Sequence, residues 1–146
     1  MNQEGLDILI LAAGYSKRMG LLSKNTPKSL IPVNGTTLLD NLINEIRKIK
    51  YKNIYIILGF KANIIFSHLQ TKYPDIKFNF IRTNLFYKRG HAYSLLLGLK
   101  QIKKNENLCL VIHADTYVNS NFFTRYMPKN FFGKSYIFLG DKNIKN

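Results

Sequence analysis

The feature that most constrains the fold is a short apolar run that ends in small residues and is followed by cations. Residues 6–11 are apolar apart from Asp7 and include two isoleucines, as is typical of a strand buried on both faces. Ala12, Ala13 and Gly14 come next, and residues of this size let backbone N–H groups approach an anion closely. Residues 8–28 therefore predict a buried strand, a sharp turn and an anion-binding loop.

Cationic residues follow the turn. Lys17 and Arg18 come shortly after it, and Lys28 stands behind Pro27. The guanidinium group of arginine offers a rigid fork of donors that suits phosphate oxygens, and lysine adds a compact charge. The glycine spacing excludes a P-loop and a dinucleotide fingerprint, because Gly20 is not followed by lysine and the three closely spaced glycines are missing. The pattern favours a phosphate site over an ordinary strand and turn with surface cations.

The net charge also points to anionic partners, without choosing among them. The 146 residues contain 22 Lys and Arg against 8 Asp and Glu, a formal net charge of +14. Nucleic acid, an anionic membrane surface and nucleoside triphosphates (NTPs) are all compatible with such a charge. Most lysines are spread along the chain among asparagines and isoleucines, which favours a general compositional bias over a dedicated basic surface.

Length and cysteine content bound the organisation. A chain of 146 residues with 46% apolar content can bury one core, so we expect a single domain over residues 1–146. Cys109 is the only cysteine, which excludes an intramolecular disulfide and indicates a buried thiol in a reducing compartment. The sequence shows no signal peptide or membrane span, so the expected location is cytoplasmic.

The rest of the chain alternates between strand and helix patterns. We expect strands at residues 53–59, 76–82 and 107–113, helices at 36–50, 61–73 and 90–103, and a loop at 86–89. This alternation predicts an α/β fold, a Rossmann-like three-layer sandwich whose mostly parallel sheet has the strand order 3-2-1-4. After residue 118 the pattern weakens to a short helix at 122–127 and a strand at 135–139.

Apolar spacing also predicts which residues face the core. In helix 61–73 the inner residues are Ile64, Ile65 and Leu69, and in helix 90–103 they are Ala92, Leu95, Leu96, Leu99 and Ile102. Helix 36–50 is expected to be capped by Thr36 or Thr37. The strand at 107–113 is nearly all apolar, which favours a central position between two helical layers.

In the order 3-2-1-4 the first and fourth strands are neighbours, so their carboxyl ends frame one crevice. Ligands of open parallel sheets bind at such a point. Asp115 follows the fourth strand, and one carboxylate together with phosphate oxygens can hold Mg²⁺. The alternative is that Asp115 caps the turn before Asn121. His113 is better explained as a hydrogen-bonded structural residue, because Mg²⁺ prefers oxygen ligands.

The motif L-A-A-G-x-S-x-R-M-G followed by Pro-Lys resembles the nucleotidyltransferases that activate sugar 1-phosphates and related acceptors. These MobA-like NTP transferases include molybdopterin-guanylyl and phosphocholine-cytidylyl branches, and the run Tyr93-Ser94-Leu95 is most similar to the latter. The resemblance implies catalytic roles for Arg18 and Lys28, Mg²⁺ as cofactor on Asp115, and nucleotide binding by Leu11, Ala12, Ala13, Gly14, Tyr15, Ser16, Lys17, Gly59, Asn84, Gly90 and Ser94. Ser16 replaces the family's usual second loop glycine, a mild change.

The residues themselves also support nucleotide binding at Gly90, although a second explanation is open. A glycine at a helix start exposes backbone N–H groups, and Ser94 adds a hydroxyl. Equally, Gly90 could simply ease the loop.

The resemblance implies transfer of a nucleoside monophosphate from an NTP, with CTP or UTP favoured, to a sugar 1-phosphate or phosphocholine, with release of pyrophosphate. Cell-surface polysaccharide biosynthesis is the expected setting. One alternative is a non-catalytic nucleotide-binding fragment. The other, less favoured, is a basic nucleic-acid-binding module, since aromatic and basic residues lie together at 86–89 but no RNP-like or helix-turn-helix pattern occurs.

Similar catalytic domains run considerably further than residue 146. After residue 139 only Asp141 could supply their second acidic residue. We therefore expect a chain truncated at its C-terminal side, which binds NTP weakly, is marginally stable or self-associates through an open sheet edge, and gains turnover when downstream sequence is restored.

Overall fold

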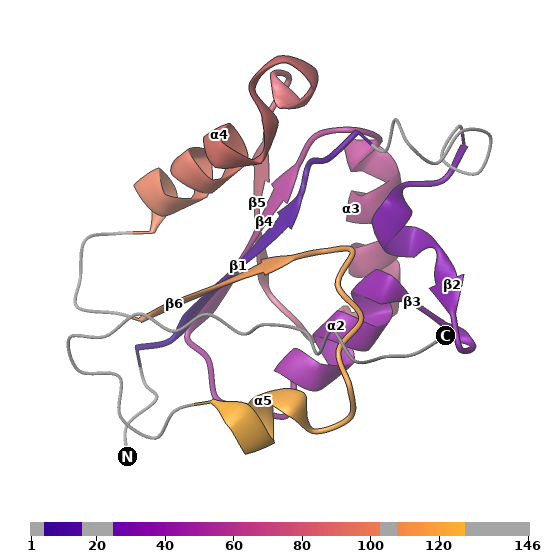
Figure 1. The fold of residues 1–146 in the computed structure, drawn as a ribbon, viewed down its shortest axis with the longest axis vertical. Helices are drawn as coiled ribbons and strands as arrows, with labels where there is room; N and C mark the ends of the chain where they lie inside the picture. Colours follow the sequence, from indigo (N-terminus) through magenta and orange to yellow (C-terminus); the bar gives the residue numbers. More distant parts are fainter. Residues whose placement is uncertain (1–4, 16–24, 103–107, 128–146) are drawn as a thin grey trace, which may run out of the picture.

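A computed structural model describes residues 5–15, 25–102 and 108–127, with Phe86 and Tyr87 described by their backbone alone. The core of the fold is a four-stranded parallel sheet with the order β5-β4-β1-β6. Its strands are β1 (Asp7–Ala12), β4 (Asn53–Leu58), β5 (Phe78–Arg82) and β6 (Cys109–His113). In chain order this is 3-2-1-4, which confirms the predicted α/β class and strand order (Figure 1).

Strand β1 is fully buried because it pairs on both sides and carries helices on both faces. All six of its residues are buried. Its Ile10 lies between Ile56 of β4 and Ile112 of β6 in the register. The continuous apolar run is therefore explained by two covered faces, as expected for an inner parallel strand.

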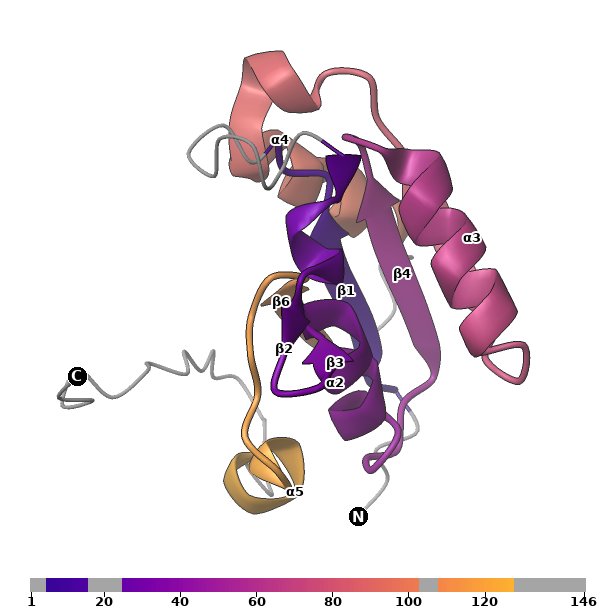
Figure 2. The same ribbon diagram turned by 90° about the vertical axis from the view of Figure 1, so that its right-hand side faces the viewer.

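The three layers follow from the alternation of side chains along β1. One face meets the helices α2 (Leu38–Ile46) and α3 (Ala62–Lys72), in a cluster that includes Ile8 and Ile10. The other face, with Leu9 and Leu11, packs with Ile102, which directly follows α4 (Phe86–Gln101). Figures 1 and 2 show α3 and α4 on opposite sides of the sheet. This confirms the three-layer arrangement.

Between β1 and α2 the chain forms a 3₁₀ turn and a small hairpin. These are η2 (Lys28–Leu30), β2 (Pro32–Val33) and β3 (Thr36–Thr37). Asn34 and Gly35 form the hairpin turn with φ of 50° and 80°, a conformation that this pair adopts readily. The Thr37 hydroxyl then accepts a hydrogen bond from the Asp40 backbone N–H at 3.1 Å, so Thr37 is the helix cap.

Helix α4 departs from the prediction in two ways. The expected loop at 86–89 is a helical turn, and Gly90 with φ 63° and ψ −167° separates it from the rest of the helix. Of the predicted inward residues, Ala92, Leu96 and Leu99 are exposed, the last two by 47% and 45%.

The buried face of α4 carries small residues instead. Ser94 is 3% exposed, and a Cβ added to Gly98 would lie 2.5 Å from Leu9 Cδ1. The helix therefore approaches β1 more closely than a leucine face would permit. Leu95 and Ile102 do pack against this side of the sheet, as predicted.

Further predictions concern the helix that follows β4, the position of β6 and the end of the chain. Ile64 is 44% exposed, so its inward placement was wrong, whereas Ile65 and Leu69 are buried as predicted. Strand β6 is the outermost strand in the described part of the sheet, and Val111 is 39% exposed, which contradicts a position between two covering layers. Self-association through the open edge expected at strand 135–139 stays a prediction. The helix expected at 122–127 is α5 (Phe122–Tyr126), and the strand expected at 135–139 lies outside the described residues.

No helix in the described part of the chain combines the length and the apolar character needed to cross a bilayer.

Candidate functional site

The candidate site lies where the parallel strands end together. The turn that follows β1 is tied to both neighbours, since Ala114 N–H donates to Leu11 C=O at 3.0 Å and Phe60 N–H donates to Ala13 C=O at 3.3 Å. These bonds hold the residues that follow β1, β4 and β6 at one edge of the sheet. The small-residue turn and the end of β6 thus lie side by side at this edge, where the strand order predicts a crevice.

Lys28 and Asp115, two residues selected from the sequence for different reasons, form an ion pair at this edge. Lys28 Nζ donates to Asp115 Oδ2 at 2.6 Å, although 87 residues separate them. Lys28 opens the 3₁₀ turn η2, and Asp115 follows β6. Their side chains are 45% and 36% exposed, so both remain accessible to a ligand.

The charge state of Asp115 is set by this pair. Partial burial alone would raise the pKa of its carboxyl, but the hydrogen bond and the positive charge of Lys28 outweigh burial and hold the pKa below its usual value. Asp115 is therefore a carboxylate at neutral pH. The Asp115 carboxylate already binds the ammonium group of Lys28, and the same oxygens are suited to bind a metal cation.

Two histidine rings pack together beside the turn. The rings of His91 and His113 pack edge to face with centroids 5.1 Å apart. His91 Cε1 lies 3.5 Å from the position that a Cβ on Gly14 would occupy, which is ordinary contact distance. The sequence reasoning assigned no role to His91. The sequence feature that could have identified His91 is its position directly after Gly90, at the start of the main part of α4.

Aromatic side chains border the turn on the β4 side. Tyr15 is 48% exposed and packs edge to face on Phe60, with ring centroids 4.6 Å apart. Lys61 Nζ lies 5.5 Å from the centroid of the Phe60 ring. Gly59 directly precedes Phe60, and its C=O group accepts a hydrogen bond from Ala62 N–H at 3.2 Å. The predicted residues Tyr15 and Gly59 thus lie together on the β4 side of the turn, with Phe60 and Lys61 beside them.

The other predicted nucleotide-binding residues have different surroundings. Leu11, Ala12 and Ala13 are buried, so only their backbone groups could reach a ligand. Asn84 and Gly90 are exposed near the start of α4, whereas Ser94 is buried on the face of α4 that meets the sheet. Ser16, Lys17 and Arg18 lie outside the described residues, and their roles stay predictions.

The described residues offer few protein ligands for a metal ion. They contain no group of three or more His, Cys, Asp or Glu side chains placed to hold one. A cation at Asp115 would therefore draw most of its ligands from water or from a phosphorylated substrate, as Mg²⁺ does when it binds nucleoside triphosphates. The site consequently fits Mg²⁺ through one carboxylate and substrate oxygens.

Comparison with protein families gives a match over most of the chain. The model that matches describes a MobA-like NTP transferase domain, and it covers residues 8–131. The chain belongs to this family. Its nucleotidyltransferase character agrees with the resemblance found in the sequence motifs.

Individual relatives are longer than this chain. The bifunctional protein GlmU of Methanococcus aeolicus is 33% identical over 111 residues, which are 75% of this chain and 25% of that protein. The structure of LicC, the CTP:phosphocholine cytidylyltransferase of Streptococcus pneumoniae, aligns with a TM-score of 0.65 and 32% identity over 81% of this chain and 48% of that one.

A third comparison is with a structure that was solved with manganese. The Mycobacterium tuberculosis protein Rv0371C, solved as a complex with manganese, aligns with a TM-score of 0.58 and 17% identity over 83% of this chain and 56% of that one. At this identity the match shows a shared fold alone. The present chain spans about half, or less, of the length of these three proteins.

Proposed function

We propose that this protein transfers a nucleoside monophosphate from CTP or UTP to a phosphorylated small molecule and releases pyrophosphate, in a reaction that depends on Mg²⁺. The observation that carries this proposal is the ion pair between Lys28 Nζ and Asp115 Oδ2 at 2.6 Å, at the edge where the small-residue turn ends β1. A cation and a carboxylate that neutralise each other without substrate can each take a new partner when a triphosphate and its metal ion enter.

In this reaction the main task of the protein is to align the acceptor phosphate with the NTP. An oxygen of the acceptor phosphate attacks the α-phosphorus of the NTP, and the bond to the bridging oxygen breaks, so that pyrophosphate leaves with the electron pair. The attacking phosphate oxygen is already anionic, so no general base is required. Positioning and charge neutralisation therefore account for the catalysis that the protein must supply.

Each residue then has a defined task. The backbone N–H groups of the turn around Gly14 would bind phosphate oxygens, and Lys28 would neutralise the α-phosphate or the acceptor phosphate. Arg18, known from the sequence alone, would neutralise the leaving pyrophosphate. Asp115 would hold Mg²⁺, which when bound neutralises the charge that develops on the phosphate oxygens.

Phosphocholine and sugar 1-phosphates are the acceptor classes that we propose. The branch-specific support is the likeness to LicC, whose described reaction uses CTP and phosphocholine and which shares 32% identity with this chain. Because this chain spans 48% of LicC, the acceptor and a role in cell-surface polysaccharide biosynthesis are part of the proposal.

The test is pyrophosphate release from each of the common NTPs, measured with phosphocholine and with a panel of sugar 1-phosphates. We expect release with CTP or UTP, and a loss of at least tenfold in Asp115→Asn and Lys28→Met, on the general scale of removing a catalytic charge. The matched controls are Asp75→Asn and Lys77→Met, which alter exposed residues at the opposite end of the sheet and should retain full activity.

Three results would contradict the proposal in different ways. Full activity of Asp115→Asn would show that Asp115 does not hold the metal ion. Nucleotide binding with no pyrophosphate under any condition would support the non-catalytic fragment. Tight, salt-sensitive binding to nucleic acid without any response to NTP would support the basic-module alternative.

A further inference from the structure

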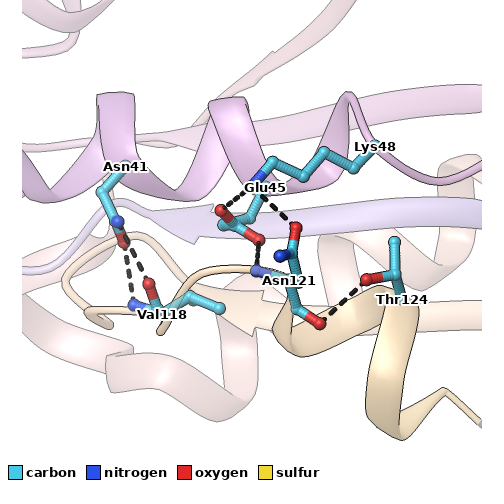
Figure 3. A network of polar contacts seen from close by, with 6 residues as sticks. All are labelled: Asn41, Glu45, Lys48, Val118, Asn121 and Thr124. Carbon is cyan, nitrogen blue, oxygen red and sulfur yellow. Dashed lines mark hydrogen bonds and ion pairs between the residues drawn. The ribbon is translucent and has the colours of Figure 1, made fainter.

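The segment that carries Asp115 into the site has no regular secondary structure, and side chains of α2 bind its backbone. Asn41 makes two hydrogen bonds to one residue of this segment, as Figure 3 shows. Its Oδ1 accepts from Val118 N–H at 2.8 Å, and its Nδ2 donates to Val118 C=O at 3.1 Å. Val118 is 5% exposed, so water cannot readily replace these partners.

A second attachment follows at Asn121. Glu45 Oε2 accepts a hydrogen bond from Asn121 N–H at 2.8 Å, and Lys48 Nζ contacts both Glu45 Oε1 and Asn121 Oδ1 (Figure 3). Glu45 is 5% exposed. Asn121 has a φ of 61° and precedes α5, whose Phe123 is buried. This second attachment therefore also holds α5 against the core, whereas the Asn41 attachment is the one nearer in sequence to Asp115.

Helix α2 is connected to the other member of the ion pair as well. It packs against η2, the 3₁₀ turn that begins with Lys28. In addition, Leu38 N–H donates to Ile31 C=O at 3.2 Å at the start of the helix. A single nine-residue helix is thus fixed at one end to the segment of Lys28 and along its length to the segment of Asp115.

We propose that Asn41 is a positioning residue, which holds the segment after β6 so that Asp115 meets Lys28 and can receive a metal ion. The Asn41 amide accepts from the N–H group of Val118 and donates to its C=O group, so it fixes the backbone of Val118 on both sides. Val118 is only three residues from Asp115. This inference rests on the proposed function, because it assigns Asn41 an effect on metal binding that acts through Asp115.

The experiment compares Asn41→Ala with Asn44→Ala in the full 146-residue chain. Asn44 is an exposed asparagine on the same helix and is the matched control. The first readout is Mn²⁺ affinity by electron paramagnetic resonance, in the presence of the α,β-methylene analogue of CTP or UTP. The second is hydrogen exchange of residues 114–121, and the third is the thermal midpoint.

We expect Asn41→Ala to weaken Mn²⁺ binding about tenfold, the scale seen when a residue that orients a metal ligand is removed. Hydrogen exchange in residues 114–121 should become faster. Asn44→Ala should match the wild type in Mn²⁺ affinity and in hydrogen exchange. Asn41→Ser, whose shorter hydroxyl cannot span both Val118 groups, should fall between them. This milder variant provides the same measurement if Asn41→Ala fails to fold.

A second pair of variants separates positioning from a purely structural role. In an Asp115→Asn background, Asn41→Ala should cause no further loss of Mn²⁺ affinity, because its effect passes through Asp115. An equal loss in both backgrounds, or an affinity within twofold of the wild type in Asn41→Ala despite faster exchange, would overturn the inference. Absence of analogue-dependent Mn²⁺ binding in the wild type would instead overturn the proposed function, and the inference with it.

Discussion

Asp40 and Asp115 are both carboxylates with lowered pKa values, yet their surroundings differ completely. Asp40 lies in the first turn of α2, is 1% exposed, and receives contacts from His68, Lys72 and Tyr73 at 2.8 to 2.9 Å. Asp115 lies at the carboxyl edge of the sheet, is 36% exposed at its side chain, and is paired with the half-exposed Lys28.

The difference separates a structural carboxylate from one that can bind a ligand. Burial would raise the pKa of Asp40, but hydrogen bonds led by those of Lys72 and His68 outweigh it and lower the pKa to about 2. Reciprocally, burial and the hydrogen bond to Asp40 raise the pKa of the Tyr73 hydroxyl. Both Asp40 oxygens are therefore engaged in joining α2 to α3, whereas Asp115 keeps an accessible carboxylate.

The largest expected effect is the loss of stability in Asp40→Ala. Removing this carboxylate leaves the Tyr73 hydroxyl buried without its acceptor and releases the contacts of His68 and Lys72. Breaking such a buried arrangement should lower the free energy of unfolding by about 3 kcal/mol, measured by urea denaturation. In the control Asp75→Asn, which removes an exposed ion pair with Arg47, the loss should stay below about 1 kcal/mol. A loss below about 1 kcal/mol in Asp40→Ala would contradict this interpretation.

The next effect is a dependence of stability on acid pH that originates at Asp40. Its pKa is lowered from 3.8 to about 2 in the folded protein. A lowered pKa means that the stabilisation is complete above the unfolded value near 4 and is lost as the pH falls toward about 2. The shift corresponds to about 2 kcal/mol.

The measurement is the free energy of unfolding between pH 5 and pH 2, in the wild type and in Asp40→Asn. The wild type should lose about 2 kcal/mol more than the variant over this range. Identical pH profiles of the two proteins would show that Asp40 does not carry this dependence.

The sequence predicted the elements that depend on local patterns and on the rules of parallel sheets. The apolar run of β1 and the alternation of strands and helices gave the order 3-2-1-4, confirmed in the structure. That order alone predicts that the small-residue turn lies beside the end of β6. The contact between Lys28 and Asp115 agrees with this convergence.

The error in α4 has a physical cause, which is that side-chain periodicity does not report close backbone approach. The leucines of α4 suggested an apolar inner face, but Gly98 allows Leu9 to pack where a side chain would stand, and Leu96 and Leu99 turn outward. Asn41 was missed for a related reason. Its partner Val118 is 77 residues further along the chain, and the spacing of polar residues gives no indication of such a contact.

The smallest expected effect on stability is that of Asp115→Asn, and it tests the comparison most directly. The pair with Lys28 is 45% and 36% exposed at its side chains, and exposed pairs contribute little because water screens them and ordering two side chains costs entropy. Without ligands, the free energy of unfolding should therefore change by less than about 0.5 kcal/mol, measured by urea denaturation. With Mg²⁺ and the α,β-methylene analogue of CTP or UTP at about 100 times the dissociation constant, the wild type should gain about 2.7 kcal/mol, and Asp115→Asn should gain much less. A ligand-free loss above about 2 kcal/mol would make Asp115 a second structural carboxylate, because a residue kept for ligand binding leaves the empty fold nearly unchanged when it is replaced.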